Sequence, residues 1–342
     1  MSHDIGRLHH VGHVVSDMGE ALTLYRRLGF TVEPPAYPTL ARRAGAAPEP
    51  FGAANTHADF PHSFVELVTC VQEGGDTRVP GEAKLVPLQA PAELLPQLVE
   101  RISDTSANVA AWLDRFEGLH ILMFSSPDID AAAARLSEAR VVHGGVNTVH
   151  RPVETIAGTL MESIRYLEVD GCAPGARPGT VSEGRVGVVS DLAPHVQGSR
   201  QTGHLNGAFE LVEVMACVAE ADLDTTAARY QDYLDRPARP DGPSRFFDLD
   251  GARLTLVPES HLATVLPGDH APALPAFVAY AVAVHDLSAT RKLLQDNGVP
   301  HHRTGSGDLF VPATSALGAA VIFRAATGTQ DQRPQPARAF RR

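Results

Sequence analysis

The sequence is short of cysteine, of positive charge and of long apolar runs. Its 342 residues include three widely spaced cysteines, Cys70, Cys172 and Cys217. An odd, scattered set of this kind excludes a disulfide framework and is typical of buried thiols in a reducing compartment. Lys and Arg total 29 against 40 for Asp and Glu, which gives a net charge of −11. Such a surface repels phosphate backbones and anionic membranes, so we expect no nucleic-acid and no membrane partner.

No apolar run approaches the roughly 20 residues that a transmembrane helix needs. The first ten residues, MSHDIGRLHH, contain no apolar signal core. We therefore expect a cytoplasmic protein. Because 44% of the residues are hydrophobic, the chain is able to fill the cores of two domains of ordinary size.

One pattern recurs four times along the chain. Each copy has an apolar strand, a turn that usually contains Asp, an amphipathic helix, a Gly and further strand candidates. The copies begin at Leu8, Gly118, Gly207 and Phe277. This repetition predicts an α+β fold of four βαβββ modules.

Three segments carry no copy of the pattern. Residues 73–117 contain PAELLPQLVERI and SANVAAWLDRF, which predict two helices able to cover a cavity. The Gly- and Pro-rich residues 173–203 predict a linker between an N-terminal domain, 5–172, and a C-terminal domain, 204–326. The polar residues 327–342 predict a disordered tail.

Three stretches together resemble the vicinal oxygen chelate superfamily, and within it the glyoxalase-like proteins. They are HHVGHVVSDMGEALTLYRRLGF at the front, a GxANxxxxFxxxFVEL stretch from Gly52 to Leu67, and an HxNGA stretch from His204 to Ala208. The resemblance implies that the modules pair into two domains, each with an open, barrel-like mixed sheet. It also implies a divalent metal ion inside the cup, held by the first and last strands of two modules.

The ligand positions carried over from the superfamily are His10, Glu66, His120 and Glu168, with Glu162 as the alternative to Glu168 if the register slips. Each shares its strand face with apolar neighbours, where an imidazole or carboxylate is costly to bury unless it is paired or metal-bound. Two imidazoles and two carboxylates suit Zn, Ni, Mn, Fe(II) or Co. The third and fourth modules lack this set, so we expect a metal-free C-terminal domain.

Other polar residues near these positions have weaker signals. His9 and His13 have the opposite parity to His10 in their strand, so we expect both to be packing residues. Candidate substrate contacts, each with a structural alternative such as a turn, a solvated loop or the inter-domain seam, are Asn55, His57, His62 and His204.

The resemblance implies that the metal holds substrate oxygens and stabilises an oxyanion or enolate, with Glu168 or Glu66 as general base. It predicts a metal-dependent lyase, isomerase or hydrolase that acts on a small oxygen-rich or aromatic metabolite. One alternative is an Fe(II) extradiol-type dioxygenase with His10, His120 and Glu168 as its triad. Another is a non-catalytic resistance protein that binds a drug or metabolite. The superfamily also allows a homodimer.

Overall fold

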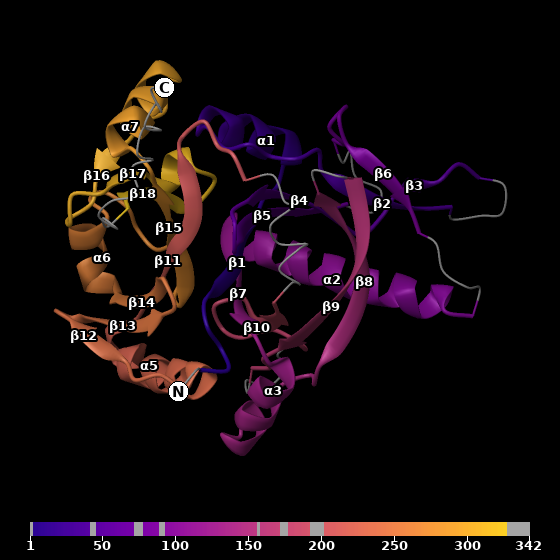
Figure 1. The fold of residues 1–342 in the computed structure, drawn as a ribbon, viewed down its shortest axis with the longest axis horizontal. Coiled ribbons are helices and arrows are strands. Elements are labelled where there is room, and N and C mark those ends of the chain that lie inside the picture. Colours follow the sequence, from indigo (N-terminus) through magenta and orange to yellow (C-terminus); the bar gives the residue numbers. More distant parts are fainter. Residues whose placement is uncertain are drawn as a thin grey trace, which may run out of the picture.

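The computed structural model describes residues 3–41, 46–71, 78–88, 93–155, 158–171, 177–191 and 202–326, without the side chains of 151–160. Figure 1 shows two units side by side, which we call the first half (residues 3–191) and the second half (residues 202–326). Each half contains two βαβββ modules around a mixed sheet, as the repeats predict.

The elements follow the four copies of the pattern. The first half contains β1 (Leu8–Val14), α1 (Met18–Arg27), β2 (Ala36–Leu40), β3 (Glu49–Pro50), β4 (Ala53–Asp59), β5 (Phe64–Cys70), β6 (Lys84–Pro87), α2 (Leu95–Arg115), β7 (Gly118–Ser126), α3 (Ile129–Glu138), β8 (Asn147–Thr155), β9 (Gly158–Glu168) and β10 (Arg185–Ser190). The second half contains β11 (Ala208–Val218), the 3-10 turn η1 (Glu220–Asp222), α5 (Leu223–Leu234), β12 (Arg239–Asp241), β13 (Ser244–Leu249), β14 (Ala252–Pro258), α6 (Glu259–Val265), β15 (Ala276–Val284), α7 (Leu287–Asp296), β16 (His302–Arg303), β17 (Leu309–Val311), the 3-10 turn η2 (Ala313–Ser315) and β18 (Ala320–Ala325).

The Asp residues of the repeat begin three of the module helices. The side chains of Asp17, Asp128 and Asp286 accept hydrogen bonds from backbone N–H groups in the first turns of α1, α3 and α7. These N–H groups have no partner within the helix, so a carboxylate at this position fixes where the helix starts. In these three modules the turn after the first strand is therefore set by a specific side chain.

Strand pairing is the same in all four modules. The first strand of each module pairs in parallel with the last, as β1–β5, β7–β10, β11–β14 and β15–β18. The first strands of paired modules run antiparallel, as β1–β7 and β11–β15. A pairing of Phe277 in β15 with Leu119 in β7 joins the two sheets.

Two predicted boundaries differ from the structure. The range 173–203, expected to be a linker, contains β10, which pairs with β7 and β9, so the second module extends to Ser190. The Gly and Pro residues around β10 conceal this six-residue strand in the sequence. The insertion forms one helix, α2, instead of two, because no Gly or Pro interrupts it after Pro96. The expected tail, 327–342, lies outside the described residues.

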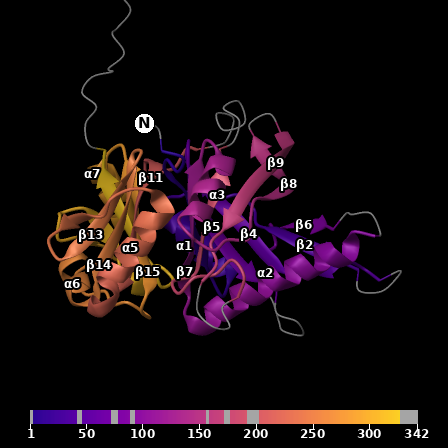
Figure 2. The ribbon, with the colours of Figure 1, turned by 90° about the horizontal axis from the view of Figure 1, so that it is seen from below.

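The helix α2 lies across the first sheet, as Figures 1 and 2 show from two directions. Its buried residues, Val109 and Trp112, belong to an apolar cluster with side chains of β1, β5, β7, β9 and β10. No helix in the described part of the chain is long and apolar enough to cross a membrane.

Candidate functional site

A cavity of about 310 Å³ lies on the face of the first sheet that α2 covers, and we call this face and its cavity the first cup. Strands of both modules of the first half line it. Thr105, Val109 and Trp112 of α2 complete the lining. The insertion therefore covers a cavity, as its sequence suggests.

The first module provides a polar wall. Glu66 lies on β5 with 13% of its side chain exposed. The Asn55 amide donates a 2.7 Å hydrogen bond to its Oε1 atom, and His57 Nε2 lies 3.8 Å from the same atom. His10 Nε2 lies 3.8 Å from Oε2. The register of β4 on β5 explains this grouping, because it places His57 directly opposite Glu66.

These neighbours keep the Glu66 carboxyl ionised. Burial alone would raise its pKa. The nearby His57 ring, the charges of His10 and His57 and the hydrogen bond from Asn55 outweigh burial and hold the pKa well below its usual range. The first cup thus contains an enclosed carboxylate anion beside two imidazoles.

A bulge in β1 places two adjacent histidines at the cavity. The register of β1 on β7 shifts between Leu8 and His10, so the alternation of side chains is interrupted at His9. Both His9 and His10 line the cavity, and their Nδ1 atoms lie 2.7 Å apart, sharing one proton. His10 also stacks on Phe64. His9, expected from strand parity to be a packing residue, is therefore also a cavity residue because of this bulge.

His13 is a packing residue between the halves. Its Nε2–H donates to the carbonyl oxygen of Leu317 at 2.7 Å, and its Nδ1 accepts from the Tyr25 hydroxyl at 2.8 Å. The Tyr280 hydroxyl donates to the Tyr25 oxygen. Burial lowers the pKa of His13, which suits a neutral imidazole in this chain of hydrogen bonds.

The structure does not bring His120 to Glu66. His10 lies seven residues before Asp17, and the residue seven before Asp128 is Ile121, which lines the cavity. His120 is therefore one residue out of register and is not among the residues that line the cavity.

The contacts of His120 are with the end of α2. Its Nε2–H donates to the Phe116 carbonyl at 2.8 Å, and its ring stacks on Trp112. Burial lowers the pKa of His120 to about 4. These contacts hold the C-terminal end of α2 against β7.

Glu168 is also displaced from the predicted position, because β10 and not β9 is the last strand of the second module. In the first module Glu66 pairs with Gly12, and at the corresponding place in the second module Gly187 pairs with Met123. Gly187 therefore occupies the position that corresponds to Glu66. Glu168 forms an ion pair with Arg185 instead. Glu162 lies opposite Arg151 in the β8–β9 pair and is not among the residues that line the cavity.

The residues present do not fit a metal ion held between the two modules. His10 and Glu66 occupy the first-module positions, but the second module offers Ile121 and Gly187, which carry no ligand atoms in their side chains. A Cβ atom on Gly187 would lie 2.3 Å from the Leu167 carbonyl oxygen, so no side chain fits there. Within the described ranges, no group of three His, Cys, Asp or Glu side chains converges on a point that could hold a metal ion.

Two further candidate contacts lie outside the cavity lining. His62 is exposed. His204 accepts a hydrogen bond on Nδ1 from the Thr31 N–H at 3.0 Å and donates from Nε2 to the Asp59 carbonyl at 2.9 Å. Both nitrogens of His204 are thus used in joining the halves.

Comparison with known proteins agrees with this architecture. A model of the glyoxalase-like domain matches residues 8–234, about two thirds of the chain. The chain belongs to the glyoxalase-like domain family. None of the curated proteins compared with it matches.

Solved structures show the same fold at low sequence identity. A hypothetical protein from Staphylococcus aureus has a TM-score of 0.52 and 9% identity, covering 93% of this chain and 98% of that one. A variant of 4-hydroxymandelate synthase from Streptomyces coelicolor has a TM-score of 0.52 and 15% identity, covering 94% and 92%. A fusion protein of a xylose isomerase-like TIM barrel with 4-hydroxyphenylpyruvate dioxygenase has a TM-score of 0.53 and 12% identity, covering 97% and 50%. At these identities the likenesses show a shared fold.

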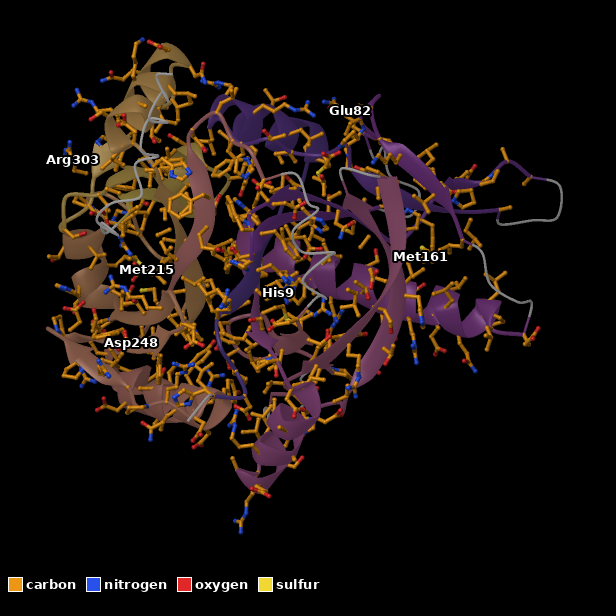
Figure 3. The ribbon with its side chains drawn as sticks, viewed as in Figure 1. His9, Glu82, Met161, Met215, Asp248 and Arg303 are labelled. Carbon is orange, nitrogen blue, oxygen red and sulfur yellow. The ribbon has the colours of Figure 1, made fainter. Side chains whose placement is uncertain are left out.

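The second half of this glyoxalase-like protein has a filled cup. Met215, labelled in Figure 3 together with His9 of the first cup, belongs to an apolar cluster with Ala279, Ile322 and Leu262 of α6. Beside this cluster, Glu213 is fully buried.

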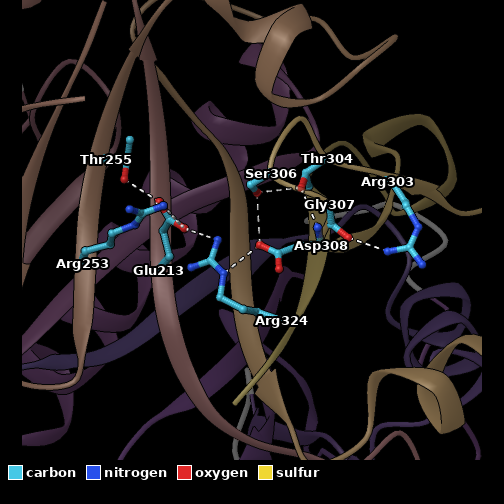
Figure 4. Close-up of polar contacts among 9 residues, drawn as sticks. All are labelled: Glu213, Arg253, Thr255, Arg303, Thr304, Ser306, Gly307, Asp308 and Arg324. Atoms are coloured by element: carbon cyan, nitrogen blue, oxygen red, sulfur yellow. Dashed lines mark hydrogen bonds and ion pairs between the residues drawn. The ribbon is translucent and has the colours of Figure 1, made fainter. Parts of the chain in front are cut away.

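Glu213 is bound on several sides, as Figure 4 shows. Arg253 Nε lies at 2.7 Å and an Arg324 nitrogen at 2.7 Å from its carboxylate, and the Thr255 hydroxyl donates to it at 2.5 Å. Arg324 is in turn paired with Asp308. All of these contacts are within the second half, so the network stabilises the filled cup.

Sequence reasoning missed two polar residues of the first cup. Arg185 and Tyr166 line the wall that is otherwise formed by apolar side chains of the second module. Arg185 is the first residue of β10 and was hidden by the Gly-rich composition around that strand. The signal that could have revealed it is the apolar run VGVV directly after a single arginine.

Proposed function

We propose that this glyoxalase-like protein is an enzyme that binds a small oxygen-bearing metabolite with an apolar or aromatic body in the first cup and moves a proton on it. The observation that carries the proposal is the ionised, enclosed Glu66 carboxylate with His10 Nε2 at 3.8 Å, facing an apolar wall across a covered cavity. A polar wall opposite an apolar one is typical of sites that orient a small ligand.

Glu66 takes the role of general base, since it is the ionised carboxylate at the cavity and can accept a proton, although its lowered pKa makes it a weak base. A substrate C–H or O–H that faces the polar wall would transfer its proton to the carboxylate, and Asn55 would keep the carboxylate oriented through its 2.7 Å hydrogen bond. His10 is close enough to return a proton to a second atom of the substrate, and its Nδ1 contact with His9 supplies a further proton-holding group. This sequence of transfers is that of an isomerase or a lyase.

The apolar wall would bind the body of the substrate. Ile121, Met123 and Trp112 offer aliphatic and aromatic surface for a small ring or chain. Because α2 covers the cavity, the base and the reacting C–H would be shielded from water, which strengthens the electrostatic interactions there. No step of this proposal passes through a metal ion, because the second-module positions carry no ligand.

The test is exchange of substrate protons with solvent deuterium, followed by NMR. We expect the protein to accelerate exchange at carbons next to the carbonyl in a panel of small aryl and alkyl ketones that includes phenylacetone. Glu66→Gln keeps the shape but removes the base, so exchange should fall by a factor of about 100 or more. The matched control is Glu82→Gln, at an exposed carboxylate paired with Arg26, which should leave exchange unchanged.

Three results would contradict this proposal. Equal exchange by the wild type and Glu66→Gln would exclude Glu66 as the base. Ligand binding without exchange would favour a metabolite-binding protein without turnover. A stoichiometric divalent ion in the purified protein that is lost in His10→Ala would show that the first module alone holds a metal.

A further inference from the structure

Arg185 is the one cationic side chain, apart from the histidines, among the described residues that line the first cup. It lies directly opposite Ile121 in the parallel β7–β10 pair. Its neighbours on this wall are apolar, except for Tyr166. A charged residue in such surroundings is costly unless its donors are satisfied.

One donor of Arg185 has no hydrogen-bond partner in the described part of the chain. A terminal nitrogen of the guanidinium is paired with Glu168, but the buried Nε–H has no hydrogen-bond partner among the residues that the structure describes. Buried donors in native proteins are nearly always paired, so a donor without a partner on a side chain that lines a cavity favours a partner supplied by a ligand. The group that would satisfy it is an acceptor oxygen of a ligand.

The charges around the cavity indicate whether the ligand's acceptor is a carboxylate or an uncharged oxygen. Glu168 already balances the guanidinium charge, and the opposite wall of the cavity carries the ionised Glu66. A carboxylate in the cavity would therefore gain little from Arg185 and would be repelled by Glu66. An uncharged carbonyl oxygen accepts the Nε–H hydrogen bond without this repulsion.

Glu168 is held in place by the backbone beside it. Gly179 has a φ of 71°, and a Cβ atom there would lie 2.5 Å from Glu168 Oε2. The backbone at Gly179 therefore packs directly on the carboxylate, and its N–H is fixed by Asp170. Glu168 is thus confined between this turn and Arg185, which fixes the orientation of the guanidinium.

We propose that Arg185, positioned by Glu168, recognises an uncharged carbonyl oxygen of the ligand in the first cup, so that the protein prefers neutral carbonyl compounds to carboxylates. This inference rests on the proposed function, because it requires a ligand in the first cup. Glu168, carried over above as a metal ligand, is here a positioning residue that acts through Arg185.

The test compares three probes of similar size by isothermal titration calorimetry: phenylacetamide, phenylacetate and toluene. We expect the wild type to bind phenylacetamide more tightly than phenylacetate. Arg185→Met should weaken phenylacetamide by roughly tenfold, the effect of one buried hydrogen bond to a charged group, and leave toluene unchanged. Glu168→Gln should weaken phenylacetamide in the same selective way.

Two further variants keep the test decisive. Arg185→Lys keeps a positive charge to pair with Glu168 but lacks the Nε–H, so it should also bind phenylacetamide more weakly. It replaces Arg185→Met in the test if the Met variant does not fold. Arg165→Met, at the exposed Arg165–Asp130 pair on β9, is the matched control and should bind all three probes as the wild type does.

The outcomes separate this inference from the proposed function. Tighter binding of phenylacetate than of phenylacetamide, or equal losses for phenylacetamide and toluene in Arg185→Met, would overturn the role of Arg185 while the first cup remained a ligand site. Failure of all three probes to bind would overturn both.

Discussion

His204 is a half-buried imidazole whose two ring nitrogens join the halves of the molecule. Nδ1 accepts from the Thr31 N–H, which leaves the proton on Nε2, where it donates to the Asp59 carbonyl. The ring also packs edge-on against Phe30 and Phe60. Protonation of Nδ1 would break the first hydrogen bond, and burial lowers the pKa of His204 to about 4.

This lowered pKa predicts a loss of stability in mild acid. Below pH 6.5 the unfolded chain binds a proton at His204 while the folded chain does not, so the free energy of unfolding falls as the pH falls towards 4. Between pH 7 and pH 5 the contribution should be about 1–2 kcal/mol. In urea unfolding, the free energy of unfolding should differ less between pH 7 and pH 5 for His204→Gln than for the wild type. An unchanged difference would contradict the prediction.

The elements differ in how much of them the sequence predicts. Asp17, Asp128 and Asp286 predict where three helices begin, because capping is local chemistry. The bulge at His9 could not be predicted, since it depends on how β1 pairs with a strand more than 100 residues away. The same holds for β10, whose strand character comes from its position between β7 and β9. The candidate site was therefore predictable in the first module and not in the second.

The packing of α2 beside β4 explains why the GxAN stretch begins with a glycine. Gly52 has a φ of 79°, and a Cβ atom there would lie 2.1 Å from Cγ2 of Ile102 in α2. Gly52 therefore allows the close approach of the helix that covers the cavity, and it also supplies a backbone conformation that side chains rarely adopt.

We expect Gly52→Ala to lower the free energy of unfolding by about 2–4 kcal/mol, through overpacking against α2 and through backbone strain. In the Ile102→Ala background the steric part is absent, so the same substitution should cost only about 1–2 kcal/mol. A double-mutant cycle measured by urea unfolding separates the two effects. If the changes in the free energy of unfolding caused by the two substitutions simply add, α2 does not pack on Gly52.

Contacts that join the two halves connect their cores across the whole molecule. The hydrogen bonds of His13 and Tyr280 cross from the first to the second half, and β7 pairs with β15 at Leu119. A buried ion pair adds to these. Glu183, 1% exposed, binds Arg229 of α5 at 2.9 Å and accepts a hydrogen bond from Tyr230. The halves should therefore unfold as one cooperative unit.

Glu183→Gln tests how much this ion pair contributes. Removing one charge leaves Arg229 uncompensated, but 28% of the Arg229 side chain remains exposed to water, which reduces the penalty. We expect the free energy of unfolding to fall by about 2–3 kcal/mol. Lys292→Met, which removes the exposed Lys292–Asp296 pair within α7, should change it by less than about 0.5 kcal/mol. In urea, both variants should keep a single transition with the wild-type slope, because β7 and β15 still join the halves. A second transition in Glu183→Gln would show instead that this pair is what couples the two halves.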